Sequence, residues 1–127
     1  MSDPIVFISR SRVRDGKLDG LRAFLAEGAP MLQADKPLTL AFLPYLSDDA
    51  TELAIVHVFA DAHAFDVHLE GVMERSSAAE EFIETIGYEI YGRPSAPVLE
   101  MMRGAAGRAG VALRLDPDVL PGFLRAG

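Results

Sequence analysis

The sequence predicts a single α+β domain of the split βαββαβ kind, and three observations favour it. Strand-like stretches rich in β-branched and aromatic residues occur at residues 5–11, 39–47, 51–59 and 88–92. Stretches with hydrophobic residues at helical spacing separate the first from the second and the third from the fourth. A length of 127 residues suits one hydrophobic core of ordinary size.

The first strand and the first helix follow directly from residue pattern. Residues 5–11 begin with apolar residues and then alternate serine with arginine, which is typical of a strand that leaves the core. After a turn at Asp15 and Gly16, leucines recur at helical spacing, so we expect a helix that ends near Asp35. Pro30 lies inside this pattern and has no N–H to donate to the i−4 carbonyl, which predicts a kink or a break.

A hairpin and a second helix come next. Residues 39–47 and 51–59 are joined by only three residues, too few for a crossover helix, so the two strands should be antiparallel. Asp61 is a plausible N-cap for a helix whose apolar positions recur at i, i+4 and i+7. These inward positions are Phe65, Leu69 and Val72.

A second helical piece is expected over residues 74–86, ended by Gly87, and a fourth strand over residues 88–92. Strand, helix, hairpin, helix and strand in this order make the ferredoxin-like arrangement, in which helices cover one face of the sheet. The other face is left bare. We therefore expect a homodimer that covers this face.

The remaining residues, 95–127, are expected to form an extension of the domain at residues 1–94, packed on that domain or on the dimer mate. Ser95 is a candidate cap for a short helix that the glycines at 104, 107 and 110 break up. Residues 111–115 are a possible fifth strand. The apolar tail should be docked, with the dimer mate as the first choice of surface. Its apolar residues are Val119, Leu120, Phe123 and Leu124.

Composition excludes several classes of protein. Half of the residues are hydrophobic and 24% are charged, which argues against disorder and for oligomerisation. The net charge of −7 would repel a phosphate backbone, so we expect no nucleic-acid partner. Without cysteine there is no disulfide, thiolate metal site or cysteine nucleophile. The apolar run near the N-terminus is too short for a signal or membrane segment, which predicts a cytoplasmic protein.

Two stretches resemble a known family. Residues 12–18, RVRDGKL, are similar to the strand-to-helix junction of the antibiotic biosynthesis monooxygenases, and residues 51–69, TELAIVHVFADAHAFDVHL, are similar to their strand, acidic cap and helix. The resemblance covers about residues 4–93. It implies a dimeric α+β barrel in which two sheets meet back to back and each subunit has a pocket between its helices and its sheet.

The resemblance also implies roles for three positions. Ser9 falls where active members often carry asparagine, Phe59 where they often carry tryptophan, and His68 where they often carry histidine. The chain has no tryptophan, which is a departure from the haem-degrading branch. The activity implied is that of a small oxygenase that uses no flavin, haem or metal.

The histidines are the catalytic candidates. His68 lies on the apolar stripe of its helix, and an imidazole with an ordinary pKa of about 6.5 could act as a base toward an acidic phenol or enol. His57 shares a strand face with Phe59, and Ser9 on the neighbouring strand could join them. The alternative for both histidines is a structural hydrogen bond, to a backbone carbonyl or across strands. His63 should be solvated.

Phe59, Phe65, Ser9 and Tyr45 are the candidate substrate-binding residues. The spacing of the three histidines lacks the i, i+4 pair of a helical metal site, so we expect no metal. Two kinds of function remain open. One is a cofactor-independent monooxygenase acting on an electron-rich aromatic or polyketide-like molecule. The other is a non-catalytic dimer that binds such a hydrophobic ligand, or an isomerase or cyclase that needs no oxygen.

Overall fold

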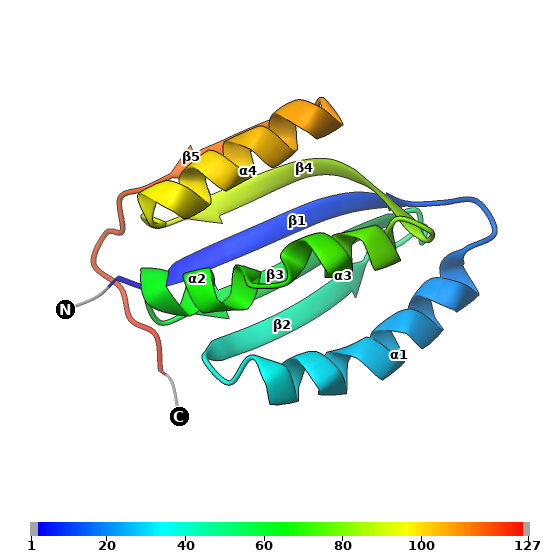
Figure 1. Ribbon diagram of the computed structural model, residues 1–127, viewed down its shortest axis with the longest axis horizontal. Helices are drawn as coiled ribbons and strands as arrows, with labels where there is room; N and C mark the ends of the chain where they lie inside the picture. The colour runs from blue at the N-terminus through cyan, green and yellow to red at the C-terminus, as the bar shows by residue number, and fades with distance from the viewer. Residues whose placement is uncertain (1–2, 126–127) are drawn as a thin grey trace.

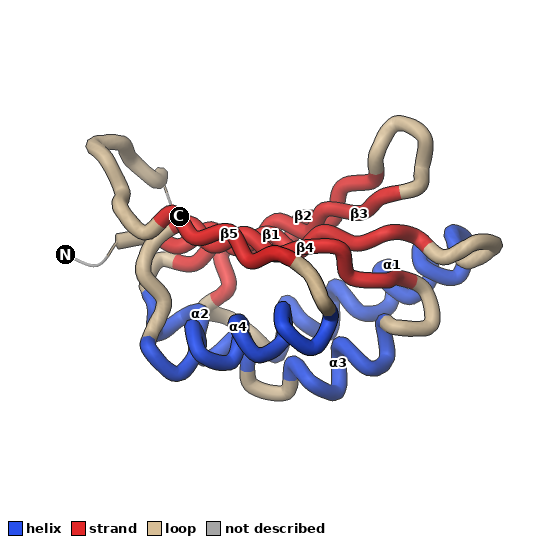
Figure 2. The backbone as a smooth tube through the Cα atoms, turned by 90° about the horizontal axis from the view of Figure 1, so that it is seen from above, coloured by secondary structure: helices blue, strands red, loops and turns tan. Residues whose placement is uncertain are grey.

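The computed structural model describes residues 3–125, which form a five-stranded sheet with helices on one side of it (Figures 1 and 2). The strand order is β2-β3-β1-β4-β5; all neighbours are antiparallel except β4 and β5, which are parallel. The predicted ferredoxin-like α+β fold with a C-terminal helix and strand is confirmed. The elements are β1 Ile5–Val13, α1 Leu18–Asp35, β2 Thr39–Leu46, β3 Glu52–Phe59, α2 Ala62–Leu69, α3 Val72–Ala79, β4 Ile83–Tyr91, α4 Ala96–Ala109 and β5 Ala112–Asp116.

The predicted hairpin and the predicted start of α2 are both confirmed. The β2–β3 turn is held by Asp49, whose Oδ1 accepts hydrogen bonds from the Thr51 hydroxyl at 2.7 Å and from the Ser47 hydroxyl at 2.8 Å. Asp61 caps α2, because its Oδ1 accepts a hydrogen bond from the Ala64 N–H at 2.8 Å. This cap fixes where α2 begins and therefore which of its residues face the sheet.

Helix α1 runs through Pro30, so the predicted break is wrong. Proline removes one backbone hydrogen bond, but Pro30 itself is exposed and the leucine face of the helix still packs against the sheet. The helix ends in regular fashion, with the Lys36 N–H donating to the Leu32 carbonyl at 2.8 Å. Packing of the apolar face thus outweighs the lost bond.

The predicted helix over residues 74–86 is wrong in its second half. Helix α3 ends at Ala79, and β4 begins at Ile83, which pairs with Val13. Because β1 is longer than predicted, β4 can pair with it along its whole length. Gly87 ends no helix; it lies within β4 beside a bulge, where Arg10 pairs with Gly87 but Ser11 with Thr85.

Helix α4 is continuous, which corrects the prediction that glycines break it. Its buried face, Val98, Met102 and Ala106, recurs every four residues and packs on the sheet. This packing outweighs the cost of about 1 kcal/mol for each interior glycine. Gly110 ends the helix with a φ of 69°. The predicted fifth strand is confirmed as β5.

The two faces of the sheet differ sharply. The core lies between the sheet and the helices and is built from large, fully buried side chains: Ile5, Phe59, Phe65 and Ile90. Alternate strand residues point to the opposite side, which no helix covers (Figure 2). We call this side the open face. It carries an apolar band made of Val6, Ile8, Ala41, Leu43, Ala54, Val56 and Val58.

The C-terminal tail is not docked on its own subunit. Leu120 and Phe123 are 78% and 86% exposed, and Val119 and Leu124 are also exposed. The tail therefore does not pack on its own domain, and docking on the dimer mate stays a prediction. Within residues 3–125 no helix has the length and hydrophobicity needed to cross a membrane.

Candidate functional site

His57 lies at the centre of β3, on the helix-covered face, and only 5% of it is exposed. Its ring packs against Phe7 at 4.8 Å and Phe42 at 5.3 Å between centroids. Its Nδ1 lies 3.0 Å from the Phe7 carbonyl oxygen, which can only accept, so Nδ1 carries the proton and donates. Nε2 of the neutral ring is then a hydrogen-bond acceptor.

His68 faces His57 from α2 and is 4% exposed. The two imidazole centroids are 5.1 Å apart with the rings nearly perpendicular, and Phe59 packs against His68 at the same distance. His68 Nδ1 shares a hydrogen bond of 2.7 Å with the Thr39 hydroxyl. The sequence had not pointed to Thr39. It faces the helices at the start of β2, where a bulge at residue 40 shifts the register.

Both imidazoles are held neutral. Burial lowers the pKa of His57 to about 4. Burial also lowers the pKa of His68 to about 3, helped by the nearby His57 ring and by the positive charges of Arg75 and Lys36. At neutral pH the pair therefore offers uncharged rings, each with one nitrogen able to accept a proton or hydrogen bond, packed among aromatic side chains.

Two cations hold the end of the helix that carries His68. The last carbonyls of a helix have no partner within it, and they form the negative end of its dipole. Lys36, only 7% exposed, donates from Nζ to the Val67 carbonyl at 3.0 Å. Arg75 donates to the carbonyls of His68 at 2.6 Å and Glu70 at 2.9 Å. Lys36 follows α1 and Arg75 lies on α3, so their meeting at α2 has no local signal in the sequence.

Replacing Lys36 with methionine keeps most of the aliphatic stem but removes the donor to Val67. We expect the free energy of unfolding to fall by about 1–3 kcal/mol, since the Val67 carbonyl loses a charged donor and keeps only the Glu70 N–H at 3.2 Å. The pKa of His68 should rise, because one of the positive charges that lowers it is gone. Urea unfolding and histidine NMR shifts measure the two effects. The control is Lys17→Met, whose amine forms an exposed pair with Glu81; an equal loss in both variants would contradict a special role for Lys36.

The other predicted site residues lie at different distances from the two histidines. Phe59 and Phe65 are fully buried and stack at 4.8 Å beside the histidines. Ser9 lies on the same sheet face, but it pairs with Ile55 and Tyr88, one pleat away from the Phe7–His57 pair. Tyr45 is not part of this cluster: it is 57% exposed and lies on the open face opposite Ala54. His63 is exposed, as expected.

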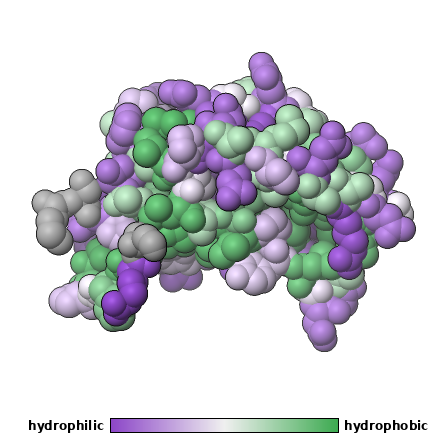
Figure 3. All heavy atoms as spheres, turned by 90° about the horizontal axis from the view of Figure 1, so that it is seen from below, coloured by the Kyte–Doolittle hydropathy of each residue, from purple (hydrophilic) through white to green (hydrophobic). Residues whose placement is uncertain are grey.

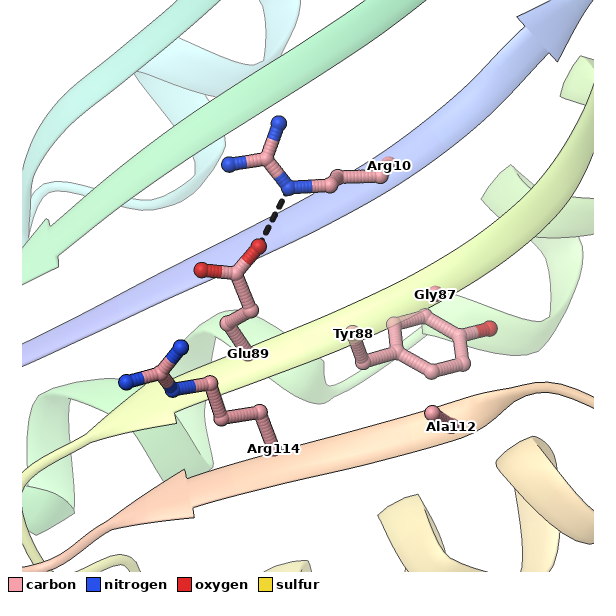
Figure 4. A pocket seen from close by; sticks show the side chains of 6 residues that line it. All are labelled: Arg10, Gly87, Tyr88, Glu89, Ala112 and Arg114. Carbon is pink, nitrogen blue, oxygen red and sulfur yellow. Dashed lines mark hydrogen bonds and ion pairs between the residues drawn. The ribbon is translucent and has the colours of Figure 1, made fainter.

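Two surface hollows lie along the open face. The larger, about 360 Å³, has two arginines on its rim and is shown in Figure 4. Its lining residues are Arg10, Gly87, Tyr88, Glu89, Ala112 and Arg114. Arg10 pairs with Glu89 and lowers the pKa of that carboxyl, and Arg114 pairs with Asp116 at 2.9 Å. These ion pairs leave the hollow with little net charge. A second hollow of about 170 Å³ extends from Arg10 to Tyr45.

Within residues 3–125, no three His, Asp or Glu side chains meet in a way that could hold a metal ion. The groups that meet at the histidine site are two neutral imidazoles, one threonine hydroxyl and several aromatic side chains. Such groups can accept a proton, orient a polar group of a ligand and keep water away from it.

Comparison with known proteins places the fold. No family model matches the chain, and no curated protein is similar to it in sequence. Among solved structures, MupZ from Pseudomonas fluorescens has a TM-score of 0.72 at 17% identity, over 98% of this chain and 96% of that chain. SnoaB, a cofactor-independent oxygenase from Streptomyces nogalater, has a TM-score of 0.59 at 19% identity, over 76% of this chain and 99% of its own.

A candidate antibiotic biosynthesis monooxygenase from Chloroflexus aurantiacus is similar in the same way, with a TM-score of 0.57 at 17% identity over 74% of this chain and 96% of that chain. The chain therefore has the fold of the antibiotic biosynthesis monooxygenases. Identities this low establish the fold alone, because one fold hosts many chemistries. The chemistry has to be argued from the histidine site.

Proposed function

We propose that this protein is a dimeric, cofactor-independent monooxygenase that acts on an electron-rich aromatic or polyketide-like small molecule. The observation that carries the proposal is the pair of buried neutral histidines, His57 and His68, packed among aromatic rings. The same fold is found in SnoaB, which is a cofactor-independent oxygenase. Neutral imidazoles beside an aromatic wall suit a flat, weakly acidic substrate.

In the proposed reaction the substrate supplies the electrons. In this scheme the Nδ1–H of His68 donates a hydrogen bond to the Thr39 hydroxyl oxygen. Nε2 is then free to take a proton from an acidic C–H or O–H of the substrate. The resulting anion passes one electron to dioxygen. The substrate radical and superoxide then combine into a peroxide anion, which takes the proton back from His68. Loss of water from the resulting hydroperoxide leaves a carbonyl. A CH₂ group and O₂ thus become C=O and H₂O, with no other reductant.

The remaining residues have supporting roles in this scheme. Nε2 of His57 accepts a hydrogen bond from a substrate hydroxyl and orients it. Phe59 and Phe65 form the apolar wall that keeps water away from the anion. Ser9 is the outer polar anchor, one pleat from His57. The low pKa of His68 means that its protonated form survives only while the substrate anion stays beside it. Transfer of the proton and formation of the ion pair are therefore coupled.

The dimer is part of the proposal. The open face carries a band of valine, isoleucine and leucine, with Leu43 44% exposed and Tyr45 more so. A second copy of the chain would bury this band by packing its own open face against it. Each subunit keeps its histidine site under its own helices in such an arrangement. In the proposed dimer, Tyr45 contacts the other subunit and does not bind the substrate.

A second function is supported by a specific observation. The Nδ1 atoms of both histidines already have partners inside the protein, and both rings have a pKa near 3 to 4. Weak bases that are already hydrogen bonded suit a dimer that binds an apolar ligand without converting it. An isomerase or cyclase would use the same proton acceptor and no oxygen.

The test is oxygen consumption by the purified protein, treated with a chelator, against a panel of anthrones, naphthols and polyphenols. We expect one O₂ consumed per carbonyl formed, with label from ¹⁸O₂ in the product at early times. Compounds that raise the melting temperature without oxygen uptake would favour the binding function. Conversion of a compound in the absence of oxygen would favour the isomerase or cyclase. Either result would overturn the monooxygenase.

A further inference from the structure

The last described residues form an apolar arm. We define the C-terminal arm as residues 117–125; four of its side chains are large, apolar and exposed on the single subunit (Val119, Leu120, Phe123 and Leu124). Residues 119–124 carry no charge, although the chain as a whole has a net charge of −7. Isolated exposed apolar residues are ordinary, but four within six residues mark a surface that another surface covers.

The direction of the arm is fixed where it leaves the sheet. The Gly92 N–H donates to the Asp116 carbonyl at 2.9 Å, and Arg93 pairs with Asp118. Figure 2 shows the arm rising from the sheet on the side opposite the helices. The β2–β3 turn rises on that side too, at the other end of the sheet (Figure 2). In Figure 3, which views the molecule from below, the space-filling surface is hollowed between two projections. The open face is thus the floor of a shallow trough.

The area of the open face is small for a stable dimer interface, so a dimer would need additional contact from the C-terminal arm. Five strands about 4.8 Å apart, each with up to nine residues rising about 3.3 Å, present a flat area of roughly 600 Å². A stable interface of standard size buries about 800 Å² on each partner. The area of the open face alone is therefore at or below the low end of the range for stable interfaces. Part of this area is also taken up by the charged residues around Arg10 and Glu89. Apolar side chains on an arm supply the remaining contact.

We propose that the C-terminal arm of each subunit packs against a second copy of this chain, along the rim of that copy's open face, and so locks the dimer. This inference rests on the dimer of the proposed function and names the segment that stabilises it. The second copy is the fitting occupant because the arm and the open face lie on the same side of one subunit. A two-fold axis then brings each arm to the other subunit's apolar band. The uncharged stretch adds no repulsion between two acidic chains.

The experiment compares full-length protein with the double variant Leu120→Ser, Phe123→Ser. Both side chains are exposed on one subunit, so the fold of the subunit should survive, and circular dichroism checks this. The matched control is the double variant Met31→Ser, Met73→Ser. Met31 and Met73 are 66% and 68% exposed but lie on α1 and α3, on the helix side. Sedimentation equilibrium over a range of concentrations gives the dimer dissociation constant for each protein.

We expect the arm variant to raise the dissociation constant by about 100-fold or more, because two arms lose contact in each dimer. The control should stay within about threefold of the full-length protein. A full-length dimer whose dissociation constant is the same in the arm variant would overturn the role of the arm while leaving the dimer intact. A full-length protein that is monomeric at every concentration would overturn the dimer itself, and the arm with it. Oxygen consumption is measured separately and decides the oxygenase alone.

Discussion

Replacing His68 with glutamine is expected to lower kcat/KM for oxygen consumption by about 100-fold or more, the usual worth of a general base. Glutamine is of similar size and its amide can still hydrogen bond to the Thr39 hydroxyl, so the packing of α2 should be kept. What it cannot do is accept the proton of the substrate. The loss should therefore fall on kcat, with KM little changed, as for an interaction made only in the transition state. Oxygen-electrode assays measure both constants.

The control for this variant is His63→Gln. His63 lies on the same helix, one turn and a half away, and is exposed to solvent. Its replacement changes the same residue type without touching the aromatic side chains around His57 and His68, so activity should stay within about twofold. An equal and small loss in the two variants would show that His68 is a core histidine with no part in the chemistry.

The second large effect concerns stability in acid. The pKa values of His57 and His68 are lowered in the folded state from 6.5 to about 4 and about 3, so the unfolded chain binds more protons between pH 6.5 and pH 4. Protons then favour unfolding in that window, and the stability present above pH 6.5 is lost as the pH falls. Each histidine contributes about 1.4 kcal/mol per pH unit, which gives roughly 4 kcal/mol for the two between pH 6.5 and pH 5.

Urea unfolding at a series of pH values from 8 to 5 measures this loss. The variant His68→Gln removes one of the two titrating groups and should reduce the slope by about half. Carboxylates contribute only at lower pH: Glu89, whose pKa Arg10 lowers further, starts from an ordinary value of 4.5. A free energy of unfolding that stays constant from pH 7 to pH 5 would mean that the histidines are not sealed from solvent.

Much of the fold could be predicted because its signals are local. The hairpin follows from a three-residue connection, and the start of α2 follows from Asp61 and the spacing after it. The boundary between α3 and β4 could not be predicted, because isoleucines at 83 and 86 fit a helical spacing as well as a strand with a bulge. Only the full length of β1, which extends to Val13, decides between the two.

The site was predictable where one element carries both the pattern and the residue. His57 and Phe59 are two residues apart on one strand and therefore share a face of the sheet, and His68 lies on the same face of its helix as Phe65. The partners of His68 come from elsewhere in the chain: Thr39 through a bulge in β2, and Lys36 and Arg75 from the ends of other helices. Tyr45 was wrongly grouped with them because sequence alone does not give the face of the sheet on which a residue of β2 lies.

The sealed, neutral histidine pair is tested most directly by long-range ¹H–¹⁵N NMR spectra of the imidazole rings, recorded from pH 8 down to pH 5. We predict that His57 and His68 keep the chemical shifts of neutral rings throughout, with the proton of His57 on Nδ1. Titration of either ring near pH 6.5 would contradict this, because a solvated imidazole cannot provide the water-free acceptor that the proposed chemistry needs.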